Sequence, residues 1–347
     1  MMTQPERKID LRKDQFLLNE HIVQWVQDFQ PKFKKILRGH TIFHASFLSI
    51  CFMEFLSFAI FFPFFKEYSL IAFALALLFL TIFSYYILHL YSQTRKPEQL
   101  KELKNIFSDG AKKIIDFEDE LAESHVSLSE IFCKFVYSLD GIEYNLIKLP
   151  TFLQKLNPQI EKLSCWIYWQ DVFSVKEMAL LAMIDEQIKL VKCDATSLEA
   201  HTALANAYVM LSALYATPPE QEDDDEEDKR WLPSKSNSAE LKQKFQTVAK
   251  RAIEEFKILC EYSPNDPWVH EQLAYSYCDL HMPLEAINEY EQILKLNPND
   301  SEAFFKVGIL YFQLGRNAHG LNVYEQLKRL HYKKAETLIS YYGAYSD

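Results

Sequence analysis

The chain has 347 residues, of which 7 are glycine, about 2% against a usual share of about 7%. Lysine and arginine number 37 and aspartate and glutamate 48, so the formal net charge is −11. The few glycines form neither of the runs that cradle phosphates in Rossmann and P-loop enzymes, and the acidic balance disfavours nucleic acid as a partner. Six cysteines without a C-x-x-C pair are typical of free thiols in a reducing compartment. The composition favours a helix-rich protein.

The first 40 residues, 1–40, are predicted to form a cytoplasmic segment that is amphipathic and then basic. Apolar side chains recur at helical spacing from Asp10 to Phe29, and Pro31 is expected to interrupt that helix. The sequence leaves two placements open for the helix. It lies on an anionic leaflet, or it packs on a downstream domain.

Two long apolar runs predict a transmembrane helical hairpin over residues 41–91. The first run covers residues 42–62 and the second covers residues 69–91, with Pro63–Tyr68 between them. A helix of about 20 residues spans the roughly 30 Å hydrocarbon core of a bilayer. The alternative is a buried core hairpin of a soluble protein. It is disfavoured because neither run has a polar stripe at helical spacing.

Positive charges flank both ends of this hairpin. Four precede the first run and four follow the second: Lys32, Lys34, Lys35, Arg38, Arg95, Lys96, Lys101 and Lys104. Because basic residues stay on the cytoplasmic side, both termini are expected in the cytoplasm. The expected localisation is therefore a membrane, with two spans, and the leading assignment is a bacterial inner membrane.

Polar side chains within and beside the apolar runs are the candidates for membrane chemistry. Glu54 lies near mid-depth, where an ionised carboxylate is costly, so it is expected to be neutral or paired with the Thr81 hydroxyl. A proton site or an oligomerisation site is the functional alternative. His40, His44 and His89 are expected at similar depth, so a zinc or haem site is a further alternative, although isolated interfacial histidines are commoner.

Residues 92–157 are interpreted as a helical stalk, and residues 158–347 as a helical repeat domain. Four helix breaks are expected in and beside the stalk: Gly110, Gly141, Pro150 and Pro158. The repeat domain is expected to begin with one degenerate hairpin, formed by Gln159–Phe173 and Val175–Lys192.

A period of 34 residues is the strongest signal in the sequence. Small residues recur at this spacing (Ala252, Ala286, Gly320), and so do aromatic residues (Phe256, Tyr290, Tyr324). With these residues, the units Pro267–Asp300 and Ser301–Lys334 resemble the tetratricopeptide repeat (TPR) family. The resemblance implies stacked pairs of antiparallel helices. The expected fold class is therefore all-α, a transmembrane helical hairpin followed by a TPR-like α-solenoid.

The repeat pattern is less regular at both ends of the array. Leu198–Leu214 is predicted to be a first helix, with its partner at about Ala239 to Tyr262. Between them lies an insertion, residues 216–238, whose acidic run Glu222–Asp228 is expected to be disordered and solvated. An alternative role for this run is to attract a basic partner or a divalent ion. Ala335–Tyr345 resembles the first helix of a further repeat.

The resemblance also implies a peptide-binding groove, because the first helix of each TPR lines a concave face. The corresponding residues of this chain are Asn206, Met210, Trp268, Glu271, Tyr275, Asp279, Glu302, Phe305, Ile309 and Phe312. This face is aromatic with scattered acids, so the expected occupant is an apolar or mildly basic protein segment. Only Asn206 and Lys306 fit the carboxylate clamp of some family members. The alternative is that the protein's own C-terminal helix or stalk covers the groove.

No catalytic or cofactor motif occurs in the sequence, so a non-enzyme without cofactors is predicted. The leading hypothesis is a membrane-anchored adaptor or scaffold for other proteins, with the bilayer as a second partner and self-association left open. The hydropathy pattern is also similar to that of inclusion-membrane proteins of chlamydiae, which implies recruitment of host factors. A third hypothesis is a membrane enzyme, or a metal or haem protein, using Glu54 with His40, His44 and His89.

Overall fold

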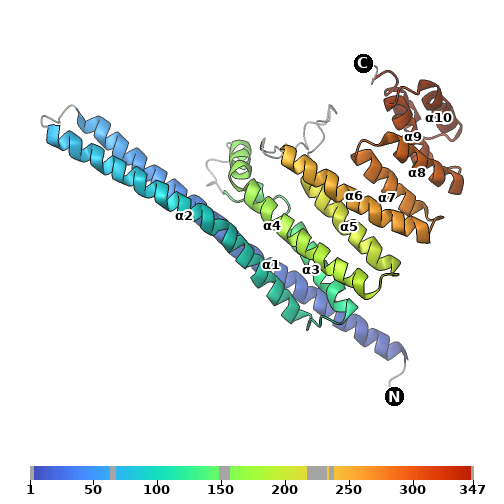
Figure 1. Cartoon of the computed structure of the whole chain (residues 1–347), viewed down its shortest axis with the longest axis horizontal. Coiled ribbons are helices and arrows are strands. Elements are labelled where there is room, and N and C mark those ends of the chain that lie inside the picture. Colours follow the sequence, from blue (N-terminus) through green and yellow to red (C-terminus); the bar gives the residue numbers. More distant parts are fainter. Residues whose placement is uncertain (1–3, 63–67, 148–156, 217–232, 234–237, 345–347) are drawn as a thin grey trace. The chain divides into compact units, whose positions relative to one another are not determined.

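A computed structural model describes residues 4–62, 68–147, 157–216, 233 and 238–344, and these contain helices and no strand. The chain divides into two compact units, the first ending at Met183 and the second beginning at Ile184. Figure 1 shows the helices in chain order. The acidic run Glu222–Asp228 and the expected break at Pro150 lie outside the described residues.

The first unit is organised by two very long helices, α1 (Gln4–Phe61) and α2 (Tyr68–Ile114). The prediction that Pro31 interrupts the first helix is wrong, because α1 continues through it. Phe29 and Phe33, 1% and 0% exposed, anchor α1 on either side of the proline and offset the backbone hydrogen bond that it removes. The α2 helix likewise continues without a break through residues 91 and 92, where the sequence predicted the boundary between the hairpin and the stalk.

Gly110 was predicted to break a helix, and this is also wrong. It lies inside α2, where a Cβ atom would be only 2.2 Å from the Trp25 ring of α1. The glycine therefore allows two helices to approach closely, and its helical conformation is held by packing that the local sequence does not reveal.

The C-terminal half of α1 and the N-terminal half of α2 are, by length and composition, long and apolar enough to cross a bilayer. No residue in the most apolar stretch of either helix is buried. Large side chains such as Phe52, Phe73 and Phe79 are 64%, 69% and 67% exposed. A core hairpin of a soluble protein would instead bury such side chains.

The other halves of α1 and α2 form a helical bundle with α3 (Ala122–Ser138). Its centre is a cluster of buried rings: Phe29, Phe33, Phe107, Phe132 and Phe135. The Gln30 amide donates to the Ser138 carbonyl at 2.6 Å, and Arg38 Nε donates to the Leu146 carbonyl at 3.0 Å. Of the two placements left open for the N-terminal helix, packing against the following helices is the one observed for residues 20–40.

After α3, the chain turns at Gly141, whose φ of 71° suits glycine, as predicted, and enters the 3-10 turn η2 (Ile142–Tyr144). Helix α4 (Asn157–Cys193) then runs without a break. The expected hairpin Gln159–Phe173 and Val175–Lys192 is therefore wrong. No glycine or proline separates the two halves, and the Ser174 hydroxyl donates to the Gln170 carbonyl at 2.8 Å, within the helix. Pro158 lies in the first turn of α4, where proline fits.

The second unit contains three successive helical hairpins: α5 (Leu198–Tyr215) with α6 (Ala239–Tyr262), α7 (Pro267–Asp279) with α8 (Pro283–Leu296), and α9 (Ser301–Gln313) with α10 (Asn317–Arg329). The helices predicted at 198–214 and 239–262 are confirmed. Asp266 and Asp300 accept backbone N–H groups at the starts of α7 and α9. The unit is a TPR-like α-solenoid, as predicted.

Small residues let the paired helices approach, as the 34-residue period indicated. Ala274 and Ala286 are completely buried. A Cβ atom on Gly320 would be 2.5 Å from the Phe312 ring, and one on Gly308 would be 2.6 Å from Leu338. Leu338 belongs to α11 (Ala335–Ile339), which is much shorter than the helix expected over Ala335–Tyr345 and packs against α9.

Two hairpins share a buried histidine–glutamate pair that ties the first helix to the second. His201 Nδ1 lies 2.7 Å from Glu255, and His270 Nδ1 lies 2.7 Å from Glu289. The other ring nitrogen faces a backbone carbonyl in each case, Ala195 at 3.1 Å and Pro264 at 3.0 Å. Since both nitrogens face acceptors, only the doubly protonated ring donates both hydrogen bonds.

The pair of His201 and Glu255 makes the stability of the repeat array depend on pH. Burial lowers the pKa of His201, but the hydrogen bonds to Glu255 and to the Ala195 carbonyl outweigh burial, so the pKa is raised overall. A raised folded-state pKa contributes stability that is complete below the unfolded value of about 6.5 and is lost as pH rises through the folded value. We expect the melting temperature of the array in the full-length protein to fall between about pH 6 and about pH 9.

The matched variants are His201→Gln, which should flatten this pH dependence, and His331→Asn at an exposed turn with φ of 54°, which should preserve it. Circular dichroism melts in detergent measure the effect. A wild-type melting temperature that rises over the same interval would contradict the assignment.

Candidate functional site

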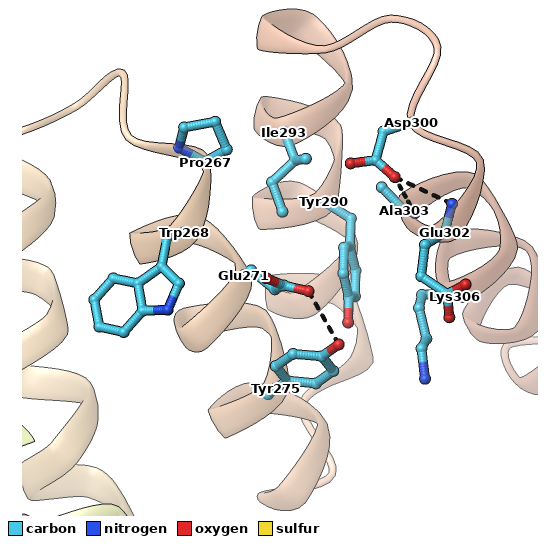
Figure 2. A pocket seen from close by; sticks show the side chains of 10 residues that line it. All are labelled: Pro267, Trp268, Glu271, Tyr275, Tyr290, Ile293, Asp300, Glu302, Ala303 and Lys306. Atoms are coloured by element: carbon cyan, nitrogen blue, oxygen red, sulfur yellow. Dashed lines mark hydrogen bonds between the residues drawn. The ribbon is translucent and has the colours of Figure 1, made fainter. Parts of the chain in front are cut away.

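A pocket of about 170 Å³ opens between α7, α8 and α9 of the second unit (Figure 2). The Asp266 cap and Pro267 set the start of α7, which places Trp268 on the pocket wall. Trp268 and Tyr275 are 39% and 38% exposed, so two aromatic faces remain open to a ligand. Such amphipathic rings are the side chains that most often anchor a bound protein segment.

Tyr290 of α8 forms the floor of this pocket. Its side chain is 2% exposed, and its hydroxyl has no hydrogen-bond partner among the described residues. Burial raises the pKa of Tyr290, so the hydroxyl stays protonated and can donate. An unpaired buried hydroxyl costs about 1–3 kcal/mol, so the fold tolerates a destabilising group at this position.

The Tyr275 ring lies 6.4 Å from the Tyr290 ring, centroid to centroid, and its hydroxyl donates to Glu271 at 3.1 Å (Figure 2). Burial, with the negative charge of Glu271, raises the pKa of Tyr275 to about 12. The Lys306 ammonium lies 5.9 Å from the Tyr275 ring centroid. The pocket therefore presents aromatic faces, a hydroxyl donor, acidic groups and one lysine.

A second cavity of about 460 Å³ shares Tyr290 and Lys306 with the first. Cys278, Ile309 and Leu310 line its apolar part. Burial raises the pKa of the Cys278 thiol to about 11, so this thiol remains neutral and behaves as an apolar wall. Together the two cavities form a groove along α7 and α9, which we call the α7–α9 groove.

The α9 side of the α7–α9 groove is partly covered by the chain itself. The Tyr332 hydroxyl donates to Glu302, and the Lys334 ammonium lies 4.0 Å from the same carboxylate. Phe305 is 7% exposed beneath Tyr332, with ring centroids 5.9 Å apart. Residues 332–334 thus cover Phe305, while Trp268 and Tyr275 stay open.

Of the ten groove residues inferred from the sequence, five line the two cavities. Trp268, Glu271, Tyr275 and Glu302 line the first cavity, and Ile309 lines the second. Asn206, Met210 and Asp279 line neither cavity. Phe312 is 2% exposed and packs against Gly320, so it is a core residue and not a groove residue. Tyr290 was not identified from the sequence as a groove residue, because the repeat pattern places a large apolar ring at this position. No sequence signal reveals that its hydroxyl has no partner among the described residues.

The polar residues of the hairpin have other partners. The Thr81 hydroxyl donates to Glu54 at 3.0 Å, as predicted. His44 and His89 lie together with ring centroids 5.1 Å apart, whereas His40 is bound to Ser92 at 2.9 Å and to Gln99 at 2.8 Å. Among the described residues, no three His, Cys, Asp or Glu side chains converge to hold a metal. The three histidines therefore do not form the metal site considered from the sequence.

No protein-family model matches the chain, and no curated protein is similar to it in sequence. Among solved structures, TTC0263, a TPR protein of Thermus thermophilus, is 16% identical, with 63% of this chain and 89% of that chain covered and a TM-score of 0.31. YrrB, a TPR protein with an unusual peptide-binding site, is 14% identical over 67% and 96% of the two chains, with a TM-score of 0.33. MamA is 15% identical over 62% and 92%, with a TM-score of 0.33. These scores are too low to transfer any property, so the fold assignment depends on the helix order and packing described above.

Proposed function

We propose that the protein is a membrane-anchored adaptor without enzymatic activity, whose α7–α9 groove holds a segment of another protein. The observation that carries the proposal is the open aromatic pocket with the unpaired Tyr290 hydroxyl. Trp268 and Tyr275 would cover the apolar side chains of a bound segment, and the Tyr290 ring would support them from below.

Charge favours an apolar or mildly basic segment. Glu271 and Glu302 line the first cavity with Lys306 as the one cation, and Asp300 caps α9 at its edge. A basic side chain would add a favourable contact with Glu271, whereas an acidic one would be repelled. Segments of this composition are therefore the proposed partners.

The anchor is the hairpin of α1 and α2. Its exposed apolar surface, its length and the basic residues at both of its flanks support insertion with both termini in the cytoplasm, in a bacterial inner membrane. Attachment to a membrane raises the local concentration of the adaptor, so that modest affinity of the groove is sufficient.

The decisive variant is Trp268→Ala in the full-length protein. Removing a central aromatic anchor should lower capture of partner segments at least about fivefold, since such truncations cost more than about 1 kcal/mol. A photo-crosslinking residue in place of Lys306, in intact cells, measures the capture. Tyr262→Ala removes an aromatic side chain that is 57% exposed and lines neither cavity, so it is the matched control. Equal yields of crosslinked adducts from Trp268→Ala and Tyr262→Ala would refute the proposal that the groove binds the partner segment.

A further inference from the structure

A second groove lies in the first unit, between α1 and α2, and extends across the ends of the two apolar runs. Its volume is about 620 Å³, and its wall is built from one face of each helix. The lining residues are Lys35, Ile36, Gly39, His40 and Phe43 of α1, with Leu88, Tyr91, Ser92, Arg95 and Gln99 of α2. We call it the interfacial groove.

The interfacial groove changes character along the helix axes. Phe43 and Leu88 lie at the end that leads into the apolar runs, and Lys35 and Arg95 lie at the opposite end. At 1.5 Å per residue, Lys35 and Phe43 are about 12 Å apart along α1, which exceeds the thickness of one headgroup layer, about 5–8 Å. The groove therefore reaches from the polar layer to the edge of the hydrocarbon.

Its polar end is prepared for a phosphate. Arg95 Nε donates to the Tyr91 hydroxyl at 2.7 Å, and the guanidinium lies 5.4 Å from the Tyr91 ring centroid. This holds the side chain while its terminal amino groups stay available for bidentate contact with a phosphate. No described residue lies in ion-pair contact with Lys35 or Arg95, and the carboxylates of Glu98 and Glu102 act on Arg95 only at longer range, so two cations face the groove.

The back wall of the interfacial groove is fixed. His40 bonds to Ser92 and to Gln99, so both ring nitrogens are used in joining α1 to α2. Gly39 lines the groove, and a Cβ atom there would meet nothing within 4 Å, so a side chain at this position would extend into open space.

We infer that the interfacial groove binds the headgroup phosphate of one anionic glycerophospholipid of the cytoplasmic leaflet, with the start of an acyl chain against Phe43 and Leu88. The two cations favour an anionic headgroup over a zwitterionic one, and the apolar end of the groove favours a lipid over free phosphate. This inference rests on the proposed membrane anchor.

Native mass spectrometry of the full-length protein in detergent, titrated with phosphatidylglycerol or phosphatidylcholine, tests it. We expect one phosphatidylglycerol to be retained in preference to phosphatidylcholine. The double variant Lys35→Gln with Arg95→Gln should weaken this at least about tenfold, since each cation attracts the anionic headgroup. Gly39→Leu should weaken it as strongly by filling the groove, without a steric clash in the helix.

The matched control is Lys101→Gln with Lys104→Gln, which removes two flanking charges outside the groove and should leave binding unchanged. Equal weakening by both double variants would mean general attraction to anions and would refute the site. Displacement of the lipid by millimolar inorganic phosphate would show a free-phosphate site and would also refute it. Alkaline extraction of membranes separates the two proposals: release of the wild-type protein refutes the anchor, whereas retention without lipid selectivity refutes only the groove.

Discussion

Phe107→Ala should unfold the bundle of the first unit while the repeat array remains folded. The Phe107 ring is completely buried and contacts four other rings, with centroids 4.2 Å from Phe135, 5.0 Å from Phe29, 5.8 Å from Phe132 and 6.4 Å from Trp25. Truncating a buried phenylalanine removes its transfer free energy and leaves a cavity, together about 3–5 kcal/mol. Because this ring joins α1, α2 and α3, the loss should be shared by all three helices.

Hydrogen–deuterium exchange of the full-length protein in detergent measures this loss segment by segment. Peptides from residues 20–38, 98–112 and 128–136 should exchange at least about a hundredfold faster, since each 1.4 kcal/mol is about tenfold. Ile106→Ala, at a neighbouring position of α2 that is 48% exposed, should change the exchange little. Peptides of α9 serve as an internal reference. Faster exchange confined to α2 would show that the ring cluster does not unite the bundle.

The helices of the repeat array could be read from the sequence because their signals are local. A cap residue, a proline at the first turn and a 34-residue spacing of small residues fix each hairpin without distant information. Gly308 and Gly320 show the physical reason for the pattern: a Cβ atom at either position would lie 2.6 Å from the Leu338 side chain or 2.5 Å from the Phe312 ring. The same logic located α5 and α6 on either side of the insertion.

The first unit could not be read in the same way because its determinants are distant in sequence. Pro31 and Gly110 are local helix breakers, and both are overridden by packing between α1 and α2. The packing of residues 20–40 depends on Phe107 and Phe135, about 80 to 100 residues away. Local helix propensity therefore could not decide whether this helix lies on a membrane surface or packs in a helical bundle.

Half of the candidate site was likewise accessible from the sequence. Trp268, Glu271 and Tyr275 follow from the repeat register, because that register decides which helix face is concave. Burial of Phe305 depends on Tyr332 and Lys334, which lie outside the repeat pattern. The unpaired Tyr290 hydroxyl is a three-dimensional property, and a pattern that only requires a large ring at that position does not contain it.

Lys96→Met should destabilise the first unit strongly, because it leaves a buried carboxylate without its partner. Lys96 of α2 lies 2.6 Å from Asp171 of α4, and the Asp171 side chain is only 10% exposed. Burial raises the pKa of Asp171, and the charge and hydrogen bond of Lys96 partly oppose this. Removing one partner of a buried ion pair costs about 3–5 kcal/mol, and the 29% exposure of Lys96 favours the lower end.

The loss in Lys96→Met should depend on pH in a direction that identifies its cause. Without Lys96 the folded-state pKa of Asp171 rises further, so the penalty is present above that pKa and disappears as acid protonates the carboxyl group. Exchange measured at about pH 7 and about pH 5 should therefore show a smaller deficit in acid. Lys101→Met, an exposed lysine on the same helix, should show no deficit at either pH.

A second substitution separates an uncompensated charge from lost packing. The double variant Lys96→Met with Asp171→Leu replaces the pair by apolar side chains of similar size, and such replacements are often neutral or stabilising. We therefore expect the double variant to be more stable than Lys96→Met alone, a non-additivity that only directly coupled residues show. If the second substitution adds its own loss instead, the lysine acts through the packing of its methylene groups, and the ion pair does not hold α2 against α4.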